Sequence, residues 1–317
     1  MRPRVVFMGT PEFAVPALLA VANACDVVRV VTRPDRPRGR GLVTSGSPVA
    51  RAAASLGLPV LRPADPRADA VRDELAPLRA DIFAVVAFGA LLTPELLALP
   101  RAGCINLHGS LLPDYRGASP IQRALWDDRA ETGVCTLFMD EGLDTGDVIL
   151  CERTAIRDDD DAGALAARLA KMGAPLLATS VVLAAAGRAQ RAPQDRSAGS
   201  YARKLRKEDG LVDWSLPART VWAHARAVTP WPGATTAFRG RRLLLVRTRP
   251  EPGAPGEPPG TLLGADDDGL RVACADGVLR VTRLKPDGRA ELDAAEWARG
   301  ARLRPGERFE NVKEMAT

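Results

Sequence analysis

Two polar side chains, Asn106 and His108, stand two residues apart at the end of a short apolar segment. The segment, Cys104 to Leu107, is flanked by glycines and is typical of a short buried strand. Because alternate residues of a strand project from one face, we expect the amide and the imidazole to emerge together. A hydrogen-bond donor beside a group that handles protons is the pair that acyl transfer needs at a developing oxyanion.

A carboxylate within reach of the imidazole is expected from the glycine- and aspartate-rich turn Asp140 to Asp147. A calcium loop is excluded, because Gly142 and Thr145 break the order of oxygen ligands that such a loop needs. A turn without chemistry is the alternative. A lone histidine is more often a packed core residue, but the loop of Gly, Ser and Pro after His108 favours a functional site.

Alternating strands and helices are expected to position these residues. Arg4 to Met8 and Asp26 to Thr32 indicate two strands around a helix, and the apolar run Asp81 to Ala87 indicates a central parallel strand. Such sheets bind ligands beyond the carboxyl ends of their strands. The predicted fold class is therefore α/β, with a Rossmann-like, mainly parallel sheet. No G-x-G-x-x-G motif follows the first strand, so a bound nucleotide is not predicted.

The second part of the chain is predicted to form a smaller domain. The composition turns polar after residue 188, and short strands separated by turns follow, which suits a small β-barrel. The predicted boundaries are 1–188 for the sheet domain, 189–205 for a linker and 206–317 for the C-terminal domain. His224, the other histidine, lies among apolar residues of an expected helix and is interpreted as packed.

The composition is that of a globular protein, with 46% hydrophobic and 26% charged residues. No uninterrupted apolar run approaches the length of a membrane span, and the start lacks a secretory pattern, so a cytoplasmic location is expected. The five cysteines are scattered and never spaced as C-x-x-C. This spacing argues against a disulfide framework and against a cysteine zinc site.

The net charge of +5 suits a polyanionic partner. A basic stretch, residues 33–51, holds five arginines among prolines and glycines and shows no periodicity. A structureless loop of this length is expected, and such loops are usually functional or disordered. A solvated loop without a partner is the alternative.

Three separated motifs resemble those of the folate-dependent formyltransferases: Asn106-x-His108, Ser110-Leu111-Leu112-Pro113-x-Tyr115-Arg116-Gly117 and Gly142-Leu143-Asp144-Thr145-Gly146-Asp147. The run Ser119 to Ala124 is similar to the branch of this family that acts on methionyl-tRNA. Segments after Tyr201 resemble the C-terminal domain of that branch, so the resemblance covers essentially the whole chain.

The resemblance implies transfer of a formyl group from 10-formyltetrahydrofolate to the α-amine of initiator methionyl-tRNA, without a metal. It implies that Asn106 donates to the oxyanion. His108, kept cationic by Asp144, would stabilise the tetrahedral intermediate and help to move protons. For the C-terminal domain it implies an OB-like barrel that binds tRNA.

Binding residues are also implied by the resemblance. The expected folate contacts are Ser110, Leu111, Leu112, Pro113, Phe88 and Gly89. The expected tRNA contacts are Arg36, Arg38, Arg40, Arg203, Lys204 and Lys207. Arg40 falls at the family's Gly-Arg-Gly position, but Leu42-Val43-Thr44 follows where lysines are usual. A monomer with no membrane partner is expected.

Three alternatives stay open. The same chemistry with a small amine or water as acceptor needs neither the basic stretch nor the second domain. A non-catalytic RNA-binding protein would use the sheet domain only as a scaffold. A nicotinamide-dependent oxidoreductase is disfavoured by the absent glycine motif.

Overall fold

The computed structural model describes residues 2–38, 43–253 and 256–311. By contacts between residues the chain divides into two compact units. Unit 1 comprises Met1–Pro120, Glu131–Ala155 and Ala166–Arg203, and unit 2 comprises Ile121–Ala130, Ile156–Leu165 and Lys204–Thr317. Two short segments that interrupt unit 1 in the sequence therefore belong to unit 2. The linear domain boundaries at residues 188 and 205 stay a prediction.

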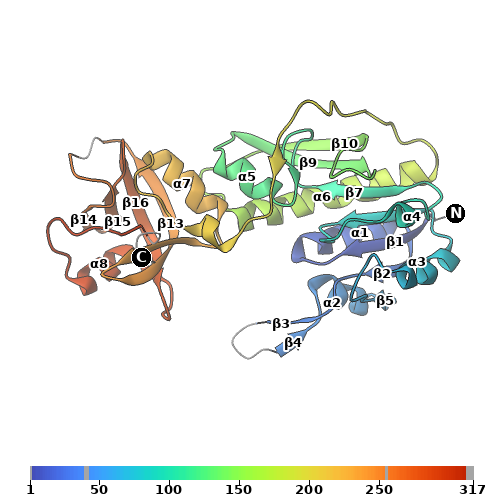
Figure 1. The fold of residues 1–317 in the computed structure, drawn as a ribbon, viewed down its shortest axis with the longest axis horizontal. Coiled ribbons are helices and arrows are strands. Elements are labelled where there is room, and N and C mark those ends of the chain that lie inside the picture. Colours follow the sequence, from blue (N-terminus) through green and yellow to red (C-terminus); the bar gives the residue numbers. More distant parts are fainter. Residues whose placement is uncertain (1, 39–42, 254–255, 312–317) are drawn as a thin grey trace. The chain divides into compact units, whose positions relative to one another are not determined.

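Unit 1 is built on a seven-stranded sheet with the strand order β10-β9-β7-β6-β1-β2-β5 (Figure 1). The strands are β1 (Arg4–Gly9), β2 (Asp26–Val31), β5 (Val60–Leu61), β6 (Ile82–Val86), β7 (Cys104–His108), β9 (Glu131–Phe138) and β10 (Val148–Ala155). The five strands from β5 to β7 run parallel, whereas β9 is antiparallel to β7 and β10 to β9. The prediction of a mainly parallel α/β sheet is confirmed.

Helices cover the sheet. They are α1 (Val15–Ala24), α2 (Pro48–Ser55), α3 (Asp69–Leu75), α4 (Pro94–Leu97) and α6 (Ala162–Ala185), with short 3-10 turns at Glu12–Ala14 and Ala76–Leu78. One core cluster joins Phe83 and Val85 of β6 to Leu75 of α3 and Leu96 of α4. Every residue of β6 is buried, as its continuous apolar run predicts.

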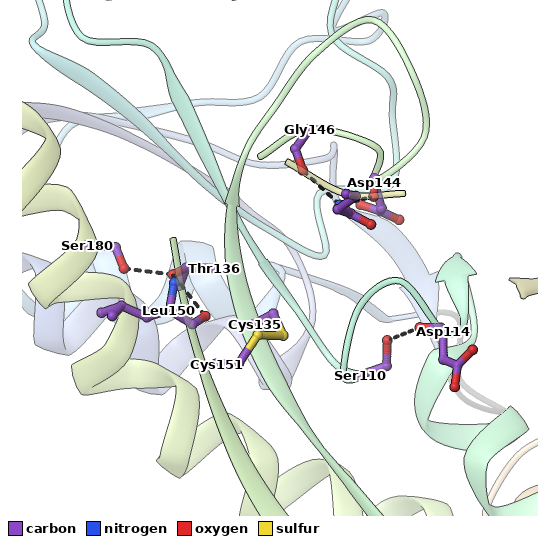
Figure 2. The surroundings of a disulfide bond; sticks show 10 residues. Ser110, Asp114, Cys135, Thr136, Asp144, Gly146, Leu150, Cys151 and Ser180 are labelled. Carbon is purple, nitrogen blue, oxygen red and sulfur yellow. Dashed lines mark hydrogen bonds between the residues drawn. A yellow bond between two sulfur atoms is a disulfide. The ribbon is translucent and has the colours of Figure 1, made fainter. Parts of the chain in front are cut away.

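Helix α6 is, within the described residues, the one helix long and apolar enough to cross a membrane. Arg168 and Lys171 interrupt the apolar run in the sequence, so no uninterrupted run reaches this length, although the helix is apolar on average. Length and composition are weak evidence of a span. Leu169 and Leu177 are fully buried, and Ser180 bonds to Thr136 of β9 across 2.7 Å (Figure 2), as in a core helix.

The basic stretch at residues 33–51 is not the structureless loop that its composition predicts. Strand β3 (Arg36–Arg38) pairs antiparallel with β4 (Val43–Ser45), and α2 follows at once. The side chain of Ser47 caps α2 by accepting the N–H of Ala50 at 3.0 Å. Extended structure suits the β-branched Val43 and its neighbour Thr44. Residues 39–42, which include Arg40, lie outside the described residues.

Cys135 of β9 and Cys151 of β10 form a disulfide (Figure 2). The two residues face each other across the antiparallel ladder, with 4.1 Å between their Cα atoms. The inference from cysteine spacing against disulfides was wrong for this pair, because only the pairing of β9 with β10 brings residues 16 positions apart together. The remaining cysteines, Cys25, Cys104 and Cys274, are free and buried.

Unit 2 contains a separate antiparallel sheet, with the strand order β12-β13-β16-β15-β14 and β17 paired to β16 (Figure 1). The strands are β12 (Ala234–Phe238), β13 (Arg241–Glu251), β14 (Leu262–Asp266), β15 (Gly269–Ala273), β16 (Val278–Pro286) and β17 (Leu292–Asp293). The helices are α7 (Ala218–Ala227) and α8 (Ala294–Ala301), and α5 (Pro120–Trp126) contributes to this unit. Trp214, Trp222 and Phe309 lie in its core cluster.

His224 of α7 makes the stability of unit 2 depend on pH. Its ring packs against Trp126 at 4.5 Å, its Nε2 lies 2.6 Å from the Asp209 carbonyl oxygen, and burial lowers its pKa below the usual 6.5. The unfolded chain therefore binds this proton at a higher pH than the folded chain does. The neutral His224 ring therefore makes its full contribution to the stability of unit 2 above about pH 6.5. This contribution is lost as the pH falls below that value.

The variant His224→Gln is expected to weaken the fall in unfolding free energy between about pH 7 and about pH 5. Urea unfolding followed by tryptophan fluorescence at several pH values measures this slope. The same slope in the variant and the wild type would show that another group causes the acid sensitivity.

Candidate active site

Strand β7 presents Asn106 and His108 on one face of the sheet. Across the antiparallel pairing with β9, Asn106 is opposite Leu137 and His108 is opposite Cys135. The intervening Leu107 is opposite Thr136, whose hydroxyl bonds to α6 on the other face. The amide and the imidazole therefore emerge together, as their two-residue spacing predicts. His108 is almost fully buried, whereas Asn106 is half-buried.

Asp144 meets both side chains although it lies 38 residues from Asn106 in the sequence. Its Oδ1 accepts a hydrogen bond from Asn106 Nδ2 at 3.0 Å, and its Oδ2 accepts one from the backbone N–H of Gly117 at 2.9 Å. The same Oδ2 lies 3.5 Å from His108 Nδ1. The structure thus brings the three predicted catalytic residues together in unit 1. Their catalytic roles stay a prediction.

His108 has an oxygen beside each ring nitrogen. Its Nε2 lies 3.0 Å from the carbonyl oxygen of Tyr115, and its Nδ1 faces the Asp144 carboxylate. Both oxygens are hydrogen-bond acceptors, so each ring nitrogen of His108 faces an acceptor. The two acceptors on opposite sides also fix the orientation of the ring.

The Asn106 side chain retains a hydrogen-bond donor. Its amide nitrogen carries two N–H groups, and Asp144 engages one of them. Within the described part of the chain, the second N–H has no hydrogen-bond partner. It is therefore available to a ligand oxygen, which is the function that an oxyanion-binding amide performs.

The turn that carries Asp144 is closed by its own side chains. Thr145 Oγ1 and the N–H of Gly142 donate to one oxygen of Asp140, at 2.7 and 3.0 Å. Gly146 passes so close to β9 that a Cβ atom there would lie 1.9 Å from the Phe138 carbonyl oxygen. Asp144 itself has a φ of 55°, in the left-handed region that residues other than glycine rarely occupy.

A cavity of about 560 Å³ opens beside this turn. Its lining residues are Pro94, Leu97, Ala98, Met139, Asp140, Glu141, Gly142 and Arg196. The volume is in the range of small-molecule sites, and the wall combines apolar residues of α4 with polar groups of the turn. The predicted folate contacts included none of these residues, because α4 is a single turn of helix that carries no motif in the sequence.

The residues predicted to contact folate occupy two loops, and none of the six lines that cavity. Ser110 is fully buried, and its Oγ donates to the Asp114 carbonyl at 2.7 Å (Figure 2). Leu111, Leu112 and Pro113 follow it and are half-buried. The side chain of Phe88 packs in the core, and the carbonyl of Gly89 accepts a hydrogen bond from Arg33 at 3.3 Å. Folate contact by these residues stays a prediction.

The residues predicted to bind tRNA do not form one cluster within a unit. Arg36 and Arg38 lie on β3, and Arg203 ends unit 1. Lys204 and Lys207 are exposed at the start of unit 2, where Lys207 begins the 3-10 helix Lys207–Gly210. Their contact with RNA stays a prediction.

Thiol chemistry does not fit the site. Cys104 is two residues from Asn106 on the same face of β7, but burial raises the pKa of its thiol to about 12. A thiol with this pKa yields little of the thiolate that acts as a nucleophile. No group of three or more His, Cys, Asp or Glu side chains that could hold a metal ion occurs among residues 2–38, 43–253 and 256–311.

The segment expected to be a linker packs against the site, which sequence reasoning missed. Strand β11 (Tyr201–Ala202) pairs in parallel with β8 (Arg116–Gly117), directly after Tyr115. Gln194 bonds to the turn that carries Asp144. The polar composition of this segment gives no signal for these contacts.

Known proteins resemble this chain along most of its length. Residues 3–181 match the family described as "Formyl transferase", and residues 204–302 match "Formyl transferase, C-terminal domain". The chain belongs to the formyl transferase family. The methionyl-tRNA formyltransferase of Myxococcus xanthus is 42% identical over 305 residues, covering 96% of this chain and 97% of that protein. The methionyl-tRNA formyltransferase of Heliobacterium modesticaldum is 45% identical over 315 residues, with coverage of 96% and 99%.

Solved structures share the fold at lower identity. The N-formyltransferase from Helicobacter canadensis, in complex with folinic acid and dTDP-3-aminofucose, has a TM-score of 0.66 and 16% identity and covers 90% of this chain. HypX from Aquifex aeolicus, in complex with tetrahydrofolic acid, has a TM-score of 0.61 and 18% identity. This chain spans 47% of the length of that HypX chain. Identities this low show the fold alone.

Proposed function

We propose that this protein transfers the formyl group of 10-formyltetrahydrofolate to the α-amino group of initiator methionyl-tRNA, giving N-formylmethionyl-tRNA for translation initiation. The proposal rests on the contacts of Asp144 with the side chains of Asn106 and His108. Relatives with this named activity are 42% and 45% identical over nearly their whole length. The chain is thus an enzyme, a formyltransferase that uses formyltetrahydrofolate.

The reaction forms a bond between the amine nitrogen and the formyl carbon and breaks the bond from that carbon to N10. The amine loses a proton, N10 gains one, and the formyl oxygen carries negative charge in between. The unengaged N–H of Asn106 donates to that oxygen. His108, with acceptors at both nitrogens, supplies positive charge next to it, and Asp144 orients both side chains.

The cavity beside the Asp144 turn is proposed to bind the ring system of the folate. Its apolar wall from α4 suits a flat ring, and the polar groups of residues 139–142 suit the hydrogen-bonding edge of that ring. The loops that hold Ser110, Leu111, Leu112 and Pro113, and Phe88 and Gly89, follow the neighbouring strands β7 and β6. In this proposal they border the same crevice.

The C-terminal sheet is proposed to be an OB-like barrel that binds tRNA. The support is a segment that connects the two outer strands of the sheet. Glu310 exchanges backbone hydrogen bonds with Ala237 of β12, while Glu307 and Phe309 bond to Leu262 of β14 and the adjacent Gly260. The basic residues Arg36, Arg38, Arg40, Arg203, Lys204 and Lys207 would contact phosphates, which gives affinity that depends on salt. A cytoplasmic monomer is part of the proposal.

A small amine acceptor is the second candidate. The sugar-bound N-formyltransferase from Helicobacter canadensis covers 90% of this chain, so the presence of a second domain does not by itself demand a large acceptor. The stronger argument for tRNA is the much higher identity to the methionyl-tRNA formyltransferases.

A single-turnover assay with 10-formyltetrahydrofolate tests the acceptor. Charged initiator methionyl-tRNA, glycinamide ribonucleotide and a dTDP-linked amino sugar are offered separately, with a reaction lacking any acceptor. Formylation of the tRNA alone is the expected result. Formylation of a small amine instead, or release of formate without an acceptor, would overturn the proposal.

A further inference from the structure

We propose that Gln194 and Ser200 are positioning residues of the active site, which hold the two oxygen acceptors on either side of His108. Both lie in the segment expected from the sequence to be a linker. Gln194 fixes the turn of Asp144, next to His108 Nδ1, and Ser200 fixes Tyr115, next to His108 Nε2. The inference rests on the proposed function, in which His108 and Asp144 act on the formyl group.

Gln194 holds the Asp144 turn through its backbone. Its Nε2 donates to the carbonyl oxygens of Asp144 at 2.9 Å and of Gly146 at 2.7 Å. These two residues lie side by side in the turn (Figure 2). Asp144 has a φ of 55°, a backbone conformation that is unfavourable for an aspartate. The hydrogen bond from Gln194 to its carbonyl oxygen holds the backbone in this conformation and so keeps the carboxylate in place.

The other end of the Gln194 amide is fixed by Arg116. Gln194 Oε1 accepts hydrogen bonds from Arg116 Nε at 3.1 Å and Nη2 at 3.0 Å. Arg116 also donates to the carbonyls of Asp195 and Ala198, so the guanidinium is tied to the same segment. A neutral amide is required at Gln194, since only an amide offers donors to the two carbonyls and an acceptor to the guanidinium.

Ser200 holds the opposite acceptor. Its Oγ accepts the backbone N–H of Tyr115 at 3.0 Å, and its carbonyl accepts the N–H of Arg116 at 2.9 Å. Tyr115 has a φ of 60°, and in this conformation its carbonyl oxygen reaches His108 Nε2. The Ser200 hydroxyl therefore stabilises a backbone conformation that an L-residue rarely adopts and that supplies one of the two acceptors of His108.

The segment that carries Gln194 and Ser200 is held against unit 1 by backbone contacts, and it belongs to this unit. Gly199 has a φ of 89°, and a Cβ atom there would lie 2.0 Å from the Pro113 carbonyl oxygen. The next residues form β11 and pair with β8. Gln194 and Ser200 thus project from a fixed support and not from a free connection.

The expected consequence of losing either contact is a slower chemical step with little change in substrate binding. Neither side chain lines the cavity beside the turn, so KM for the folate is expected to stay within about threefold. A catalytic group displaced by about 1 Å typically costs about 10²-fold in rate. Gln194→Ala and Ser200→Ala are therefore expected to lower kcat by about 10- to 100-fold.

Matched controls come from the same segment. Gln190→Ala removes an exposed glutamine four positions earlier, and Ser197→Ala removes a hydroxyl that bonds to the exposed Asp195. Both controls are expected to keep the wild-type kcat. Gln194→Glu keeps the acceptor for Arg116 but sets a carboxylate oxygen against two carbonyls, so it is expected to be as slow as Gln194→Ala. A Gln194→Glu variant with the wild-type kcat would refute the donor role.

Nuclear magnetic resonance of ¹⁵N-labelled histidine supplies a readout that does not need activity. The chain has only two histidines, so His108 and His224 give separate ring signals. Gln194→Ala and Ser200→Ala are expected to shift the ring nitrogen signals of His108 and to leave those of His224 unchanged. An unchanged His108 signal together with wild-type kcat would overturn the proposal, and so would a general loss of structure that moves both signals.

The proposed function and the positioning role of Gln194 and Ser200 are tested by separate measurements. If the wild type does not formylate methionyl-tRNA, the proposed function is wrong, yet the His108 signals still report whether Gln194 and Ser200 position the ring. If the wild type is active and both variants match the controls, only the positioning role is wrong.

Discussion

Asp144→Asn is expected to slow single-turnover formyl transfer by about 10²- to 10³-fold, the loss that removal of one oxyanion-stabilising contact typically causes. The carboxylate accepts hydrogen bonds from two donors, Asn106 Nδ2 and the N–H of Gly117. An asparagine side chain can accept at only one of its two terminal atoms, so its NH₂ group must face a donor. The substitution also removes the negative charge that lies 3.5 Å from His108 Nδ1.

Asp147→Asn is the matched control for this substitution. It lies in the same turn, but its carboxylate pairs with the largely exposed Arg191 at 3.4 Å, and exposed ion pairs contribute little. The control is expected to keep the wild-type rate, and thermal unfolding should show that both variants are folded. A rate for Asp144→Asn within about threefold of wild type would remove Asp144 from the mechanism.

The features predictable from the sequence alone are those that depend on local patterns. The alternation of Cys104, Asn106 and His108 sets their common face, because a strand repeats every two residues. The apolar run at β6 predicts a strand covered on both faces, and its burial confirms this. Neither inference needs knowledge of distant contacts.

The rest of the site depends on the path of the backbone between elements. Asp144 came from the resemblance to a family and not from its own pattern, since nothing local places it near Asn106. The hydrogen bonds from Gln194 to Asp144 and from Tyr115 to Ser200 depend on left-handed backbone at Asp144 and Tyr115. This conformation is uncommon for residues other than glycine. The disulfide of Cys135 depends equally on strand order. Composition gives no signal for any of these contacts.

The basic stretch shows the same limit in a different way. Prolines and glycines predict a loop, and their spacing has no period, but β3 and β4 form because two short extended segments pair with each other. Pairing between strands of three residues each leaves a weak signal in the sequence. The composition therefore shows that this stretch is basic, but it predicts the wrong backbone conformation for β3 and β4.

Two substitutions of Asn106 are expected to separate two contributions to catalysis. One is the hydrogen bond that the amide donates to the oxyanion, and the other is the absence of a negative charge at position 106 beside Asp144. Asn106→Ala removes the donor and should lower the rate of formyl transfer by about 10²- to 10³-fold. Asn106→Asp removes the donor as well and places a second carboxylate where the amide nitrogen lies 3.0 Å from Asp144 Oδ1. Because the Asp144 side chain is only 12% exposed, this repulsion is poorly screened, and the aspartate variant should be slower than the alanine variant.

The dependence on pH distinguishes the two variants further. Two carboxyl groups this close share one proton, which bridges them and removes the repulsion between two negative charges. The ratio of the rate of Asn106→Asp to that of Asn106→Ala is therefore expected to rise as the pH is lowered from about 8 to about 5. Taking the ratio cancels the protonation of the attacking amine, which affects both variants alike. A ratio that stays constant with pH would mean that repulsion between the carboxylates at positions 106 and 144 does not slow the aspartate variant.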